Sequence, residues 1–208
     1  MASKDNSYTF QSAVRAAFLT VFDPKAFMKN GKPTGELKYS ATLLIPETSP
    51  ELASLKAAMA EAARSKWATR SLGELKFPLT SGAKMAEKAA AKGKDGSFFS
   101  GNVVLKTSSK FPPVLSILQN GRIITLDSDA LKAQWKSKFY NGCMVAVSVN
   151  FVPYDGQGDA DGVTAYIQSV LWVGDGERIG GKDQAEVFKS YVGSVTNEDP
   201  IGDDEIPF

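Results

Sequence analysis

The sequence contains no histidine and a single cysteine, Cys143, and these two scarcities exclude several classes of protein. Without histidine there is no Ser-His-Asp triad, no Cys-His pair, no imidazole base and no histidine-ligated zinc. With one cysteine there is no internal disulfide and no thiolate cluster, so a reducing compartment is the simplest location. Cys143 lies in an apolar stretch, and we interpret it as a small core residue rather than as a nucleophile.

Long apolar stretches are also missing. The longest stretch without a charged residue, 139–154, includes Asn, Gly, Ser and Pro and falls short of the about 20 apolar residues that a spanning helix needs. The first residues, MASKDNSYTF, carry Lys4 and Asp5 where a secretory signal is apolar. We therefore expect no signal peptide, no membrane span and a soluble, cytoplasmic protein.

Charge is present in almost equal amounts of both signs but is unevenly distributed. The chain has 24 Lys and Arg against 23 Asp and Glu, a formal charge of +1, yet residues 194–208 hold five acids and no basic residue. Without those five acids, residues 1–193 carry 24 basic against 18 acidic side chains, a formal charge of +6. The asymmetry predicts a folded domain at 1–193 with a polyanion partner, followed by a flexible acidic tail at 194–208.

Most of the predicted elements are strands. Residues 9–22 alternate apolar and polar side chains, with Phe10, Phe18 and Phe22 in the register of a half-buried strand that Asp23-Pro24 closes. A loose basic loop (Lys25, Lys29, Lys32) would join this strand to a second one at 36–45, forming a hairpin. Further strands are expected at 75–79, 102–108, 114–118, 144–152 and 163–173, with the last two forming a hairpin.

Two helices interrupt this pattern. Ser49-Pro50-Glu51 provides a helix start, and apolar residues at helical spacing continue to about Trp67. A short polar helix is expected at 128–137. With no strand-helix-strand rhythm, the pattern predicts a mostly β fold with helical insertions, an OB-type antiparallel barrel.

An Ala- and Lys-rich stretch at 83–94 allows two interpretations. If it is helical, Lys84, Lys88 and Lys92 fall one turn apart on one face and form a positive stripe. The same spacing also describes a solvated face relieved by Glu87. We favour the solvated face.

Two motifs suggest enzyme chemistry, and neither is complete. Residues 176–182 fit the first seven positions of a phosphate-binding P-loop, but Asp183 stands where Ser or Thr must hold Mg²⁺, so we interpret a glycine-rich turn. Asp155, Asp159 and Asp161 suggest a calcium site, but their spacing does not match an EF-hand, so we interpret a polar hairpin loop. We expect no enzyme activity, no metal and no cofactor.

What the sequence does offer is aromatic residues, 12 Phe, 6 Tyr and 3 Trp, interleaved with lysines. Single-stranded nucleic acid is bound by a cationic groove that follows the backbone and by rings that stack on the bases. Strand edges and loops are where such rings are available, whereas most Phe residues belong to the core. The candidate DNA contacts are Arg15, Lys38, Tyr39, Lys76, Phe77, Lys106, Lys110, Phe111 and Tyr154.

The last six residues have the composition of a docking peptide: acids keep it solvated, a proline restricts it, and an apolar pair ends it. They are Asp203, Asp204, Glu205, Ile206, Pro207 and Phe208. This hexapeptide resembles the acidic C-terminal tip of bacterial single-stranded DNA-binding proteins, differing only in Glu205 for Asp. The resemblance implies docking on replication and repair proteins.

The body has a resemblance of its own. Residues 38–46 (KYSATLLIP), 139–151 (FYNGCMVAVSVNF) and 174–181 (GDGERIGG) resemble segments of a phage-encoded single-stranded DNA-binding protein family. The similarity spans roughly 10–192 and implies an OB fold, a location in the host bacterial cytoplasm, and coating of single-stranded DNA during phage replication or recombination. It assigns no DNA contacts.

Two other functions stay open from the residues alone. A folded adaptor that binds no nucleic acid would use the domain only to present its tail to a host replication protein. A phosphohydrolase or nuclease would use the carboxylates at 155–161 with a divalent metal, and we rank it lower. The oligomeric state is also open, a homo-oligomer included.

Overall fold

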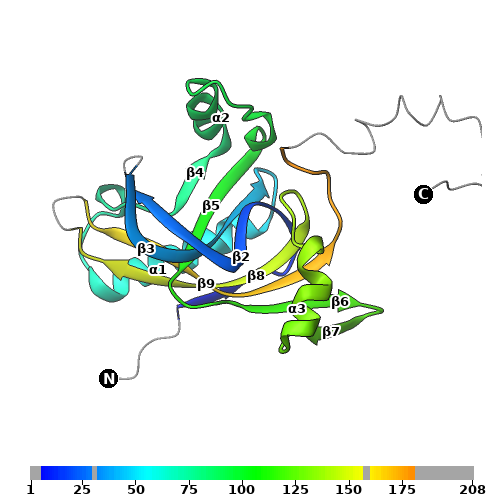
Figure 1. Cartoon of the computed structure of the whole chain (residues 1–208). Helices are drawn as coiled ribbons and strands as arrows, with labels where there is room; N and C mark the ends of the chain where they lie inside the picture. Colours follow the sequence, from blue (N-terminus) through cyan, green and yellow to red (C-terminus); the bar gives the residue numbers. More distant parts are fainter. Residues whose placement is uncertain (1–5, 30–31, 157–159, 181–208) are drawn as a thin grey trace, which may run out of the picture.

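The computed structural model describes residues 6–29, 32–156 and 160–180, so the acidic tail and the boundary expected after residue 193 lie outside the described residues. Figure 1 shows a curved sheet with helices at its ends. The strands are β1 (Ser7–Thr9), β2 (Val14–Lys29), β3 (Lys32–Pro46), β4 (Leu79–Ser81), β5 (Asn102–Ser109), β6 (Val114–Gln119), β7 (Arg122–Thr125), β8 (Met144–Tyr154) and β9 (Gly162–Gly174). The α-helices are α1 (Glu51–Lys66), α2 (Gly82–Ala90) and α3 (Asp129–Trp135), and short 3-10 turns lie at Leu72–Glu74, Ser97–Phe99 and Lys136–Lys138.

The sheet curls back on itself into a barrel. Its strand order is β4-β5-β3-β2-β8-β9-β6-β7, with β1 paired to β8, and β5 also contacts β9. The five long strands β5-β3-β2-β8-β9 thus form an OB-like barrel in which β5 contacts β9 without a hydrogen-bonded ladder among the described residues, and the β2–β3 and β8–β9 hairpins project to the same side in Figure 1. The expected class, mostly β with helical insertions, is confirmed; one pairing, β6 with β9, is parallel rather than antiparallel.

The core fills the barrel from alternate positions of each strand. On β8, Val145, Val147, Val149 and Phe151 are buried, whereas the residues between them are half-buried. α1 closes one end of the barrel with the apolar face expected from its spacing, and Ser49 Oγ accepts a hydrogen bond from Glu51 N at 3.3 Å. Within the described residues, no helix combines the length and the apolar character that crossing a membrane requires.

The first long strand differs from the expectation in two ways. It does not close at Asp23-Pro24: β2 continues, and Lys25 pairs with Lys38 on β3, so Lys25 lies in a strand and not in a loop. A register shift between Thr20 and Lys25 accommodates the proline, which cannot donate to a ladder. Phe18 is not a core residue: it sits at a second irregularity with φ 50° and its ring is 52% exposed.

Two short elements also differ. At 75–79, where a strand was expected, Lys76 forms only an isolated bridge with Gly162, and the strand β4 begins at Leu79 and ends at Ser81. The strand β7 was not expected; all four of its residues are exposed, so it lacks the alternation that identifies a half-buried strand. Asn120 and Gly121 both have positive φ and form the tight turn that joins it to β6.

The glycine-rich segment after β9 is a packed turn, in line with our interpretation of residues 176–182 as far as they are described. Tyr140 Oη donates to Gly176 O at 2.8 Å, and Ile179 N donates to Asn141 O at 2.8 Å. Gly142, at φ 112°, lies so close that an added Cβ would be 2.0 Å from Glu177 O. The turn therefore depends on the absence of a side chain at Gly142.

We predict that Gly142→Ala lowers the free energy of unfolding by about 2 kcal/mol, because it adds backbone strain and a steric clash. The measurement is urea unfolding followed by circular dichroism. Gly174→Ala is the matched control, since an added Cβ there meets no atom within 4 Å. Equal stability of the two variants would contradict the close packing described for this turn.

Candidate nucleic-acid interface

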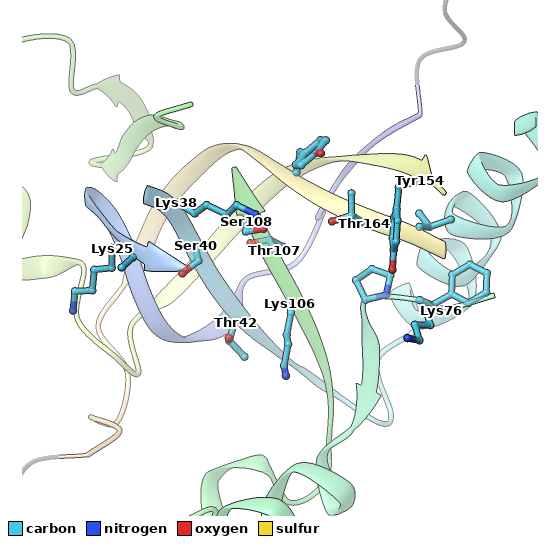
Figure 2. A pocket seen from close by; sticks show the side chains of 15 residues that line it. Lys25, Lys38, Ser40, Thr42, Lys76, Lys106, Thr107, Ser108, Tyr154 and Thr164 are labelled. Atoms are coloured by element: carbon cyan, nitrogen blue, oxygen red, sulfur yellow. The ribbon is translucent and has the colours of Figure 1, made fainter. Parts of the chain in front are cut away.

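Two adjoining clefts run across the outer face of the barrel between the two long hairpins. The larger, of about 810 Å³, crosses β2, β3, β5 and β9 (Figure 2), and the smaller, of about 480 Å³, continues it along β5 and β9. Lys38, Ser108 and Tyr166 line both clefts, so the two form one continuous surface, which we call the barrel groove. Its charged and aromatic lining residues are Lys25, Lys38, Lys76, Phe77, Lys106, Lys110, Phe111, Tyr154 and Tyr166.

The polar side of β3 forms one wall of the barrel groove. Lys38, Ser40 and Thr42 line it. The alternate residues Ala41 and Leu43 are buried in the core. Successive side chains on a strand point to opposite faces, so the same short sequence supplies both the wall and the core.

The β9 strand repeats this division on the other side. Thr164, Tyr166 and Gln168 line the barrel groove, and Ala165 and Ile167 between them are buried. In Figure 2 the labelled Thr164 lies beside Tyr154, which comes from the end of β8. The groove is thus built from strands that are distant in sequence but adjacent in the barrel.

Three aromatic rings in the barrel groove are accessible. Phe111 is 78% exposed, Tyr166 is 43% exposed and Tyr154 is 37% exposed. Phe77 also lines the groove, but it is half-buried and packs against the core. Tyr166 is absent from the candidates drawn from the sequence; the alternation in VTAYIQ (163–168) is the signal that would have found it, because Tyr166 is out of phase with Ala165 and Ile167.

Positive charge is concentrated in the barrel groove, where five lysines and, among the described lining residues, no Asp or Glu are found. The pKa of Lys106 lies below its ordinary value because the amine is partly buried and because Lys88 and Lys92 lie near it. An acid is present at the rim: Glu36 accepts from Lys110 Nζ at 2.8 Å and lies 3.1 Å from Lys38 Nζ. These two contacts hold the pKa of Glu36 below its usual range.

The structure brings seven of the nine candidate contacts together in the barrel groove: Lys38, Lys76, Phe77, Lys106, Lys110, Phe111 and Tyr154. Tyr39 is elsewhere, on the face of β3 opposite to Lys38 and Ser40. Arg15 lies in a separate polar cleft, where its Nη2 donates to Glu177 O at 2.6 Å and pairs with the Glu177 carboxylate at 3.2 Å. The docking residues 203–208 lie outside the described residues.

The two described aspartates of the β8–β9 loop, Asp155 and Asp161, form ion pairs with basic residues. Lys66 Nζ donates to Asp155 Oδ2 at 2.6 Å, and Arg70 pairs with Asp161. The Gly156 N–H and the Arg70 guanidinium hold the pKa of Asp161 below its ordinary value. Asp159 lies outside the described residues, within which no group of three potential metal-ligating side chains occurs. The described carboxylates tie the loop to the end of α1.

Comparison with known proteins identifies the relatives of this fold. A family model described as "Enterobacter phage Enc34, ssDNA-binding protein" matches residues 9–199. The chain belongs to this family. This confirms the resemblance seen in the three body segments, and the matched range is close to the one they suggested.

A curated phage protein and two solved structures are also similar to this chain. Putative protein p50 of Acyrthosiphon pisum secondary endosymbiont phage 1 is 27% identical over 189 residues, covering 90% of this chain and 95% of that protein. The single-stranded DNA-binding protein of bacteriophage Enc34, solved in complex with single-stranded DNA, matches with a TM-score of 0.60 and 17% identity, covering 86% of this chain and 97% of that one. The single-stranded DNA-binding protein gp2.5 of bacteriophage T7 matches with a TM-score of 0.50 and 12% identity, covering 96% and 100%. The two structural matches show a shared fold.

Proposed function

We propose that this protein binds single-stranded DNA along the barrel groove and coats it with little sequence preference during phage DNA replication and recombination in the host bacterial cytoplasm. The observation that carries the proposal is the convergence of five lysines and three accessible rings on one groove whose described lining includes no acid. Membership of the family and the complex of the Enc34 relative with single-stranded DNA support it.

The residue types explain how such a groove holds a strand. Lysines attract the phosphates and release their counterions, which provides affinity without reading the sequence. Tyr154, Tyr166 and Phe111 offer ring faces on which bases stack, and every base has such a face. Hydroxyl groups of Ser40, Thr42 and Thr164 between these charges and rings are available to phosphate or sugar oxygens.

The proposal extends to the acidic end of the chain. Residues 203–208 combine three acids with an apolar pair, the chemistry of a peptide that docks on a basic, partly apolar pocket of a replication protein. Because this segment and DNA are both anionic, the segment also competes for cationic surface when no partner holds it. Support for this part comes from composition and from the resemblance to bacterial tips.

The stacking assignment is tested by Tyr166→Ala and Phe111→Ala. Each change should cost about 1–3 kcal/mol of binding free energy for oligo-dT, with little change in the dependence of affinity on salt, because it removes a stacking face and no charge. Fluorescence anisotropy titration measures both quantities.

Phe18→Ala is the control for these variants, because its ring is also strongly exposed but does not line the barrel groove. Undiminished affinity in both groove variants would refute stacking at these rings. If the unaltered protein retains no oligo-dT at low salt, the adaptor function replaces the proposed one.

Glu36→Gln should strengthen binding, because it releases Lys38 and Lys110 from the carboxylate that now neutralises them. We expect affinity to rise roughly twofold to fivefold, the range that surface ion pairs contribute, together with a steeper salt dependence. Glu47→Gln makes the same change of charge at an exposed site that does not line the barrel groove. Weaker binding by the Glu36 variant, or an equal gain in both, would contradict the predicted competition.

Deletion of residues 203–208 should tighten binding to oligo-dT at low salt, because it removes a competing polyanion. The gain should disappear as salt rises, since screening weakens exposed charges. The measurement is the same titration at two salt concentrations. Unchanged or weaker affinity of the truncated protein at low salt would count against competition by the tail.

A further inference from the structure

Lys106, which lines the barrel groove, lies on β5, and β5 contacts α2. In Figure 2 the Lys106 side chain points away from Lys38 and toward the end of β5 where α2 is attached. α2 packs on β4 and β5, and Met85 and Ala86 on its inner side lie against the smaller core cluster. Its lysines are exposed, and two basic side chains of this region, Lys88 on α2 and Lys92 in the turn after it, lie near enough to lower the pKa of Lys106.

These three lysines differ from several other basic residues on the described surface, which pair with acids. Lys66, Lys136 and Lys138 each bond to an aspartate, at 2.6, 2.6 and 3.0 Å. Lys88, Lys92 and Lys106 form no ion pair with an acid within the described parts of the chain.

The acid on α2 does not neutralise this group. Glu87 forms no ion pair within the described residues and is not among the groups that influence the Lys106 amine. Like charges that converge with no acid between them repel one another, and a bound anion relieves that repulsion. Because Lys88, Lys92 and Lys106 adjoin the barrel groove, the anion that suits them best is the one that binds in this groove.

We propose that Lys88 and Lys92 form, with Lys106, a second phosphate-binding site that extends the barrel groove, so that single-stranded DNA leaves the barrel across α2. This inference rests on the proposed function and adds a direction to it: the strand runs from the rings of the groove past Lys106 onto the helix. The positive stripe considered for Lys84, Lys88 and Lys92 is therefore adopted for its last two members in place of the solvated face.

A strand that continues from the barrel groove onto α2 makes the contribution of Lys88 and Lys92 depend on the length of the DNA. A short oligonucleotide is held by the rings and lysines of the barrel and does not reach α2, whereas a longer one reaches both. Site sizes of OB folds range from about 4 to about 16 nucleotides, so oligo-dT of these two lengths brackets the difference.

The test compares full-length Lys88→Gln/Lys92→Gln protein with the unaltered chain by fluorescence anisotropy, using oligo-dT of about 4 and about 16 nucleotides. For the longer oligonucleotide, affinity at low salt should fall roughly tenfold and the log–log salt slope should become shallower by about 1.4, about 0.7 for each lost phosphate contact. For the shorter one, both quantities should match those of the unaltered protein.

The matched control is Lys132→Gln/Lys136→Gln, which removes the same charge from lysines that pair with Asp129 and Asp23. This control should bind both lengths as the unaltered protein does, and equal unfolding midpoints should show that all three proteins are folded.

An unchanged salt slope for the longer oligonucleotide in the Lys88/Lys92 variant would overturn the extension while leaving the proposed function intact. Equal losses for both lengths, or equal losses in the control, would also overturn it, because the lysines would then act within the barrel or through net charge alone. Failure of the unaltered protein to bind either length would overturn the proposed function and this inference with it.

Discussion

The barrel groove depends on the two-residue period of three strands. The barrel wall is a single β-sheet. Each strand must therefore present apolar side chains to the core and polar side chains to the groove from neighbouring positions. On β5, Leu105 is buried while Lys106 lines the groove. Thr107 is buried at the floor of the groove and donates its hydroxyl to Ala41 O at 2.9 Å, which ties β5 to β3. A slip of one residue in this pairing would turn Lys106 into the core and expose the leucine. The stability of the barrel and the composition of the groove are therefore set by the same register.

The placement of acids explains how a chain of almost zero net charge has a cationic groove. Asp155, Asp161 and Asp175 are engaged by Lys66, Arg70 and Lys138, outside the groove. The five acids of residues 194–208 offset most of the formal charge of +6 that residues 1–193 carry. Glu36 at the rim is different, since it occupies two groove lysines and so moderates their attraction for an anion.

Much of the fold was predictable because strong local patterns decided it. The helix start at Ser49-Pro50, the alternation of β8 and the turn at Asn120-Gly121 each reflect a local physical preference that the structure keeps. The strand irregularities were not predictable in the same way. Phe18 fits the apolar register of β2, but the bulge that turns it outward depends on pairing with other strands.

In the candidate site, too, local sequence patterns predict only part of the arrangement, and the pairing of distant strands decides the rest. Lys38 and Tyr39 are adjacent in sequence, and this adjacency places them on opposite faces of β3, so only the lysine lines the groove. The alternation within 163–168 indicates that Tyr166 faces away from the core, but its place in the groove depends on the approach of β9 to β5, which no local pattern states. Lysines near aromatic residues in the sequence indicated which residue types line the groove better than which individual residues do.

The central claim is that single-stranded DNA lies in the barrel groove against its rings. A crystal structure of the full chain bound to oligo-dT tests this claim most directly. The account predicts bases stacked on Tyr154 and Tyr166 and phosphates within reach of Lys38 and Lys106. Oligonucleotide bound on the opposite face of the barrel, with the groove empty, would contradict it.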